Sequence, residues 1–150
     1  WSWSRGLGDV YKRQAKLLPD STLAIPVSGS DSEIVARAAK LAGKDAVIYY
    51  EDYGYPEQEK YKKISKQIAD ELGYKWVSHS ATYQDTLERM EYWTEKIGFY
   101  CRGWYINNGL LDKIPSKQFI VVGGGDLEKD NPVHRYCAET FIGPDWDTTD

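Results

Sequence analysis

Residues 23–43, LAIPVSGSDSEIVARAAKLAG, contain the features that decide the fold. The apolar run 23–27 is typical of a buried strand, and a turn of small polar residues, 28–32, follows it directly. Beyond the turn, apolar residues recur with the spacing of one helical face: Ile34, Val35, Ala38 and Leu41. The segment therefore predicts a strand, a tight turn and an amphipathic helix that ends at Gly43.

This turn has the arrangement that binds phosphate groups in many proteins. A strand that turns straight into a helix directs backbone N–H groups and the positive end of the helix dipole at one point. The turn is not a Walker A loop, because no Gly-Lys-Ser/Thr follows Gly29, and it lacks the dinucleotide pattern Gly-x-Gly-x-x-Gly. An ordinary strand-to-helix turn, capped by a serine or aspartate, remains the alternative.

Length and composition predict one soluble globular domain. The 150 residues carry a net charge of −4, and no apolar run approaches the roughly 18 residues of a membrane span. Acidic neighbours balance the lysines of segment 60–66, so we expect neither membrane association nor a nucleic-acid-coating surface. The isolated Cys101 and Cys137 predict free thiols in a reducing compartment, the cytoplasm.

The two ends of the chain differ from its middle. Residues 1–14 have no helical or strand period and resemble a translated adapter, so we expect a non-native leader there. The chain stops in the polar stretch 144–150, which ends no recognisable element. We therefore expect one domain over residues 15–150, truncated at its C-terminus.

Strands and helices alternate along the rest of the chain. Further strands are predicted over 45–50, 75–78 and 118–122, with helices from Glu57 to Gly73, after the capping box Thr82–Asp85, and over 102–113. This alternation predicts an α/β fold: a Rossmann-like three-layer sandwich with a four- or five-stranded parallel sheet. Ligands of such sheets bind beyond the carboxyl ends of the strands, at the switch point in strand order. The turns after the first and fourth strands would meet there.

The hexapeptide 27–32, Val-Ser-Gly-Ser-Asp-Ser, resembles the Ser-Gly-Gly-x-Asp-Ser loop of the PP-loop ATP pyrophosphatases. Gly29, Asp31 and Ser32 match that pattern, whereas Val27 and Ser28 depart from it, and an alignment with a one-residue deletion stays open. Segment 45–76 is similar to asparagine-synthase-type PP-loop domains, and segment 31–37 to stand-alone viral and metagenomic members. A viral member would act in the host cytoplasm.

The resemblance implies roles for named residues. It implies ATP with Mg²⁺ as cofactors and attack by a substrate oxygen on the α-phosphate, giving an adenylate and pyrophosphate. Binding residues would be the loop Ser28, Gly29, Ser30, Asp31 and Ser32, together with Gly123 and Gly124 of a second motif. Adenine would rest against the backbone of Tyr49, Tyr50 and Glu51. Asp31 and Asp126 would be catalytic and would hold the metal. The partner would be a small-molecule acceptor of unknown identity, and a homodimer is left open.

Three alternatives remain at this level. The altered loop motivates a degenerate nucleotide-binding module without catalysis. A sulfonucleotide-reductase-like member is disfavoured, because Cys101 and Cys137 do not form the C-terminal motif of such enzymes. A flavodoxin-like domain would bind FMN or no nucleotide. The tyrosines at 49, 50, 53 and 55 could form a stacking surface for a base, although packing is the favoured interpretation.

Overall fold

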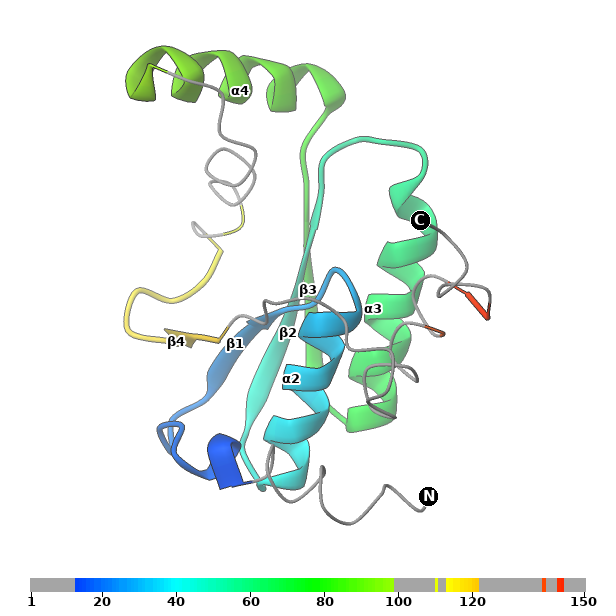
Figure 1. The fold of residues 1–150 in the computed structure, drawn as a ribbon, viewed down its shortest axis with the longest axis vertical. Helices are drawn as coiled ribbons and strands as arrows, with labels where there is room; N and C mark the ends of the chain where they lie inside the picture. Colours follow the sequence, from blue (N-terminus) through cyan, green and yellow to red (C-terminus); the bar gives the residue numbers. More distant parts are fainter. Residues whose placement is uncertain (1–12, 99–109, 111–112, 122–138, 140–142, 145–150) are drawn as a thin grey trace.

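The computed structural model describes residues 13–98, 110, 113–121, 139 and 143–144. Its elements, in chain order, are β1 (Leu23–Pro26), α2 (Ser30–Leu41), β2 (Ala46–Asp52), α3 (Gln58–Leu72), β3 (Lys75–Ser80), α4 (Tyr83–Ile97) and β4 (Phe119–Ile120). The four strands form one all-parallel sheet in the order β3-β2-β1-β4 (Figure 1). The predicted α/β fold with a four-stranded parallel sheet is confirmed.

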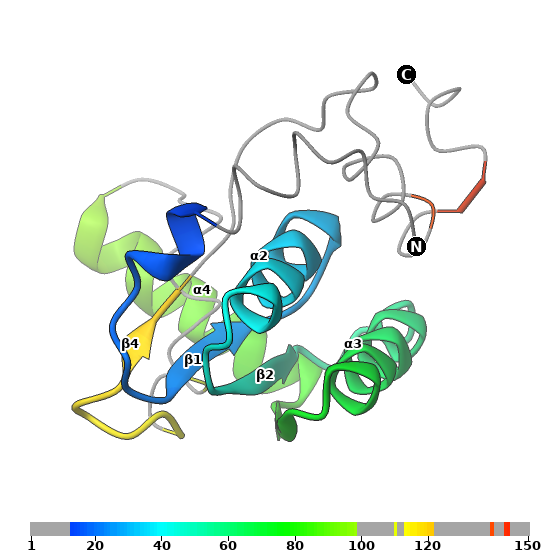
Figure 2. The same ribbon diagram turned by 90° about the horizontal axis from the view of Figure 1, so that it is seen from below.

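Each face of the sheet has its own apolar cluster, because side chains alternate along a strand. Leu23, Ile25 and Ile48 point to the face that α2 and α3 cover (Figure 2). Ala24 and Tyr49 point to the other face, where they pack against Leu110 and Ile114. The central strands are therefore buried on both sides, as a Rossmann-like sandwich requires.

Helix α2 follows the turn as predicted, and three of the four predicted apolar residues lie on its buried side: Ile34 and Ala38 are buried, and Val35 packs against the core. The fully buried Ala36 and Ala39 pack toward the sheet, whereas Leu41 is 47% exposed. Leu41 follows Ala39 by two residues, about 200° around the helix, so it points away from the sheet. Gly43 has φ 73° directly after the helix, the left-handed conformation expected of a C-terminal glycine.

Strands β2 and β3 are longer than the sequence predicted. β2 continues through Glu51 and Asp52, beyond the predicted strand 45–50, and β3 continues to Ser80, beyond the predicted strand 75–78. The two strands pair in register as far as Asp52 and Ser80, so backbone pairing extends each strand beyond its apolar segment. The predicted helix from Glu57 to Gly73 is found as α3, with Ile68 and Leu72 buried and Tyr61 and Ile64 packed beside them.

Helix α4 lies across the carboxyl ends of β2 and β3 (Figure 1). The predicted capping box is present: the Asp85 N–H donates to Thr82 Oγ1, and the Thr82 N–H donates to Asp85 Oδ2. A Cβ at Gly54, in the loop after β2, would lie 2.5 Å from the Tyr83 nitrogen. The loop after β2 and the start of α4 therefore contact each other through backbone atoms.

The predicted fourth strand is found as β4, whose register places Phe119 beside Leu23. Most of the predicted helix 102–113 lies outside the described residues, as do residues 1–12 and Cys101 and Cys137. In the part of the chain that the structure describes, none of the helices combines the length and apolarity needed to cross a membrane.

Candidate functional site

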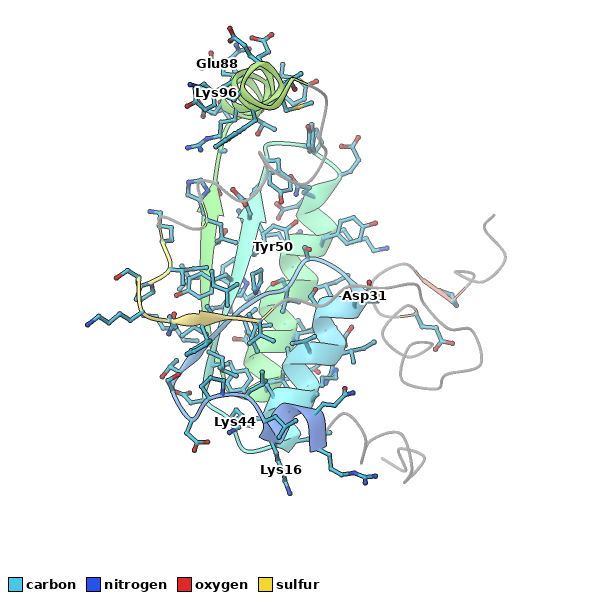
Figure 3. All side chains as sticks on the ribbon, turned by 60° about the vertical axis from the view of Figure 1, so that its left-hand side comes forward. Lys16, Asp31, Lys44, Tyr50, Glu88 and Lys96 are labelled. Carbon is cyan, nitrogen blue, oxygen red and sulfur yellow. The ribbon has the colours of Figure 1, made fainter. Side chains whose placement is uncertain are left out.

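The turn after β1 opens at the point where the strand order reverses. From β1 the chain adds β2 and β3 on one side, whereas β4 pairs with the other side of β1. A parallel sheet of this kind has its ligand crevice at the carboxyl end of such a reversal. Figure 3 shows Asp31 at the N-terminal end of α2, with Lys44 and Lys16 below it, near the bottom of the view. The predicted phosphate loop therefore lies at the expected edge of the sheet.

The backbone of this loop is unstrained. Gly29 is extended, with φ −168° and ψ −174°, and no residue other than glycine has a positive φ among the described residues. Nothing lies within 4 Å of a Cβ built at Gly29. Ser28, which stands where the PP-loop pattern has a glycine, has no positive φ, so a side chain is compatible with its backbone conformation.

Ser32 holds the loop closed through its hydroxyl group. Its Oγ accepts hydrogen bonds from the backbone N–H groups of Ser28, at 3.0 Å, and Gly29, at 3.2 Å, and it donates to the Gly29 carbonyl at 2.9 Å. Two of the N–H groups expected to contact phosphate are thus engaged within the loop. Ser30, Asp31 and Ser32 form the first turn of α2, where helical N–H groups have no carbonyl partner in the helix.

A buried ion-pair network supports this first turn. Glu33 is fully buried, and its Oε1 accepts a hydrogen bond from Arg37 Nε at 2.8 Å. The same guanidinium donates to Glu71 Oε2 on α3 at 3.0 Å. The network joins the N-terminal half of α2 to the end of α3.

The predicted adenine-contacting tyrosines belong to the core. Tyr49 is 4% and Tyr50 is 1% exposed, so packing, the favoured interpretation, is borne out for both side chains. The Tyr50 hydroxyl donates to the Gln58 carbonyl, and burial raises the pKa of Tyr50 to about 12 (labelled in Figure 3). Any contact between a base and these residues would have to involve their backbone.

Glu51 has a different environment from the two tyrosines. Its residue is 7% exposed, and its Oε2 has no hydrogen-bond partner among the described residues. Burial raises the pKa of Glu51 to about 7, although a hydrogen bond from the Leu110 backbone and the charge of Arg89 act in the opposite direction. Its Oε1 lies 3.7 Å from His79 Nδ1, a buried atom that likewise has no hydrogen-bond partner in the part of the chain that the structure describes. The Glu51 carboxylate and the His79 imidazole thus lie close together without a hydrogen bond between them.

A pocket of about 410 Å³ lies next to this pair, between the end of β3 and α4. Its lining includes His79 and Ser80 from β3, and Asp85, Glu88, Arg89 and Tyr92 from α4. The volume falls in the range of small-molecule sites in proteins. The carboxyl edge of the sheet therefore carries two features: the loop after β1 and this pocket after β3.

The predicted metal site is only partly within the described residues. Asp31 is partly buried at the start of α2, whereas Asp126, Gly123 and Gly124 lie outside the described residues. Across the described ranges, no three His, Cys, Asp or Glu side chains are grouped so that they could hold a metal ion. Mg²⁺ in nucleotide sites is usually held by one or two carboxylates together with phosphate oxygens, so a single Asp31 fits that mode.

His79 and Arg89 were not among the residues predicted from the sequence. In the sequence His79 is isolated, because its neighbour in space, Glu51, is 28 positions away in the chain. The period-two patterns Val47-Tyr49-Glu51 and Val77-His79 place both polar residues on one face of the sheet. These two patterns could have predicted the contact between Glu51 and His79 only if the register of β2 and β3 had been known.

Comparisons with known proteins leave the chain without a family. The sequence matches no protein-family model, and it matches no curated protein.

Proposed function

We propose that the chain is an ATP-binding domain that activates a small-molecule substrate by adenylation, with release of pyrophosphate. The observation that carries the proposal is the position of the loop 28–32: it joins β1 to α2 at the reversal in strand order. A triphosphate at this point would meet the N–H groups of the first turn of α2 and the positive end of its dipole.

Each residue of the loop 28–32 would have its own role in binding the nucleotide. The N–H groups of residues 30–32 would bind phosphate oxygens, and the hydroxyls of Ser28 and Ser30 would add donors. Asp31 would hold Mg²⁺, whose chemistry would be to neutralise charge on the leaving pyrophosphate. Ser32 would exchange its bonds with the Ser28 and Gly29 N–H groups for bonds with phosphate.

A second function, nucleotide binding without catalysis, is favoured by one observation. Because the Ser32 hydroxyl already satisfies two loop N–H groups, the empty loop is stable as it stands, and phosphate has to compete with that bond. A loop of this kind would bind nucleotide more weakly than one with free N–H groups. Release of pyrophosphate with a panel of carboxylate acceptors distinguishes the two functions.

Calorimetric titration of the full chain with ATP, with and without Mg²⁺, tests the proposal. We expect Mg²⁺-dependent binding that Asp31→Ala weakens at least about tenfold, or about 1.4 kcal/mol. Without Mg²⁺, Asp31→Ala should bind ATP no more weakly than the unaltered chain, because the carboxylate then only repels phosphate. Glu59→Ala is the matched control, since Glu59 is an acid in the first turn of another helix, α3. Absence of ATP binding by the folded chain would overturn the proposal.

A further inference from the structure

We propose that the pocket between the end of β3 and α4 binds a small aromatic alcohol, whose hydroxyl group donates a hydrogen bond to His79 Nε2. Glu51 would act through His79 as a positioning residue: it would hold the imidazole proton on Nδ1, so that Nε2 can accept. No residue of the loop 28–32 takes part, so the proposal is independent of ATP binding.

The first argument is the contact between Glu51 and His79. The two residues are opposite each other on neighbouring parallel strands, β2 and β3. Glu51 Oε1 lies 3.7 Å from His79 Nδ1, a buried nitrogen without a hydrogen-bond partner among the described residues. A displacement of about 0.5 Å would bring these atoms to hydrogen-bond distance. A neutral imidazole carries one N–H group, and a carboxylate beside Nδ1 favours the tautomer with the proton on that nitrogen.

The second argument is the side of the imidazole that meets the pocket. His79 lines the pocket, and its side chain is 22% exposed although Nδ1 is buried. The two nitrogens of an imidazole point in different directions. Nε2 is therefore the polar side-chain atom through which His79 can bind a molecule in the pocket. With the proton on Nδ1, Nε2 is an acceptor and requires a donor from the ligand.

The third argument is the charge on Glu51. This carboxyl group is faced by His79 from β3, by Arg89 from α4 and by the Leu110 backbone. Burial raises the pKa of Glu51 to about 7, although the Leu110 backbone and Arg89 act in the opposite direction. At pH 8 the carboxylate is therefore mostly ionised and can accept from the Nδ1–H group. A protonated carboxyl group would instead donate to Nδ1 and leave the imidazole proton on Nε2.

The class of ligand follows from the rest of the lining. Asp85 and Glu88 bring carboxylates and Arg89 a guanidinium, so the lining does not have charges of one sign only. Tyr92 is 52% exposed and adds an aromatic ring, against which a second ring can pack. The volume of about 410 Å³ is sufficient for a small aromatic molecule. A hydroxyl group provides the donor that Nε2 requires without adding a charge.

The test is NMR of the imidazole nitrogens in the nitrogen-15-labelled full chain at pH 8. His79→Gln identifies the signals, because His134 is the second histidine of the chain. We expect His79 in the Nδ1–H tautomer, and a saturable shift of its Nε2 signal with millimolar phenol. Anisole, in which a methyl group replaces the hydroxyl hydrogen, should produce no such shift.

Two variants test the role of Glu51. Glu51→Leu should convert His79 to the Nε2–H tautomer and weaken phenol binding about fivefold, the equivalent of roughly 1 kcal/mol for one hydrogen bond. Glu59→Leu is the matched control, since the Glu59 side chain on α3 is 62% exposed, and it should keep both the tautomer and the affinity.

Three outcomes would overturn the proposal. The unaltered chain could have His79 in the Nε2–H tautomer, phenol could shift the Nε2 signal no more than anisole does, or Glu51→Leu could keep the Nδ1–H tautomer. The first two outcomes need no variant, so the proposal can be tested even if Glu51→Leu fails to fold. ATP is absent throughout, so failure here would leave the proposed nucleotide site unaffected.

Discussion

The Ser32 hydroxyl accepts a hydrogen bond from the Ser28 backbone N–H at 3.0 Å, across the turn that opens α2. The same oxygen accepts from the Gly29 N–H, so one side chain replaces the carbonyl partners that a turn would otherwise supply. This bond makes Ser32 a structural residue of the loop whether or not a phosphate binds there.

Ser32→Ala should therefore lower the free energy of unfolding. The substitution leaves the N–H groups of Ser28 and Gly29 without their acceptor in a partly buried turn, at a cost of about 1–2 kcal/mol. Urea denaturation followed by circular dichroism measures the change. Ser28→Ala is the matched control, because the Ser28 side chain is exposed. If both variants lowered the free energy of unfolding equally, the structural role of the Ser32 hydroxyl would be contradicted.

Arg37→Met tests the buried network below the loop. It removes the guanidinium that pairs with the fully buried Glu33, and breaking a buried ion pair from one side costs about 3–5 kcal/mol. The double variant Glu33→Gln/Arg37→Met should recover part of this loss, because no buried carboxylate is then left unpaired.

The control for Arg37→Met is Lys66→Met, which breaks an exposed ion pair with Asp70 one turn along α3. Exposed pairs of this kind contribute within about 0.5 kcal/mol, so the control should change the denaturation midpoint little. If Arg37→Met and Lys66→Met lowered the free energy of unfolding equally, the burial of the Glu33–Arg37 pair would not contribute to stability.

Glu51→Gln should change stability in a pH-dependent way. The folded-state pKa of Glu51 is raised from 4.5 to about 7, so the folded protein binds a proton more tightly than the unfolded chain. The contribution of Glu51 to the free energy of unfolding is complete below pH 4.5 and is lost as pH rises to about 7. Glutamine resembles the protonated form, so the variant should match the unaltered chain at pH 4.5 and be more stable at pH 8, by on the order of 2 kcal/mol.

Thermal or urea unfolding of both proteins at pH 4.5, 6 and 8 measures this difference. Taking the difference between variant and unaltered chain cancels the other titrating groups. A variant that is less stable than the unaltered chain at pH 8 would indicate that ionised Glu51 has partners that stabilise it.

The sequence by itself determined the order of the elements and the ends of several of them. Local patterns decide such features: the glycines after α2 and α3, at positions 43 and 73, adopt left-handed conformations that side chains disfavour, and the capping box at Thr82 needs only residues four positions apart or fewer. The parallel sheet followed from the alternation of strands and helices, because parallel strands require crossover connections. The position of the loop 28–32 at the carboxyl edge followed from the same argument.

Only the tertiary structure decided which side chains meet. Glu51 and His79 are paired by the register of β2 with β3, and a shift of one residue would have placed them on opposite faces. Leu41 is exposed because α2 packs on the sheet through Ala36 and Ala39, which lie on the other side of the helix. Tyr50 is buried because α3 packs against β2. Local sequence therefore specified the strands and helices, whereas long-range packing brought Glu51 next to His79.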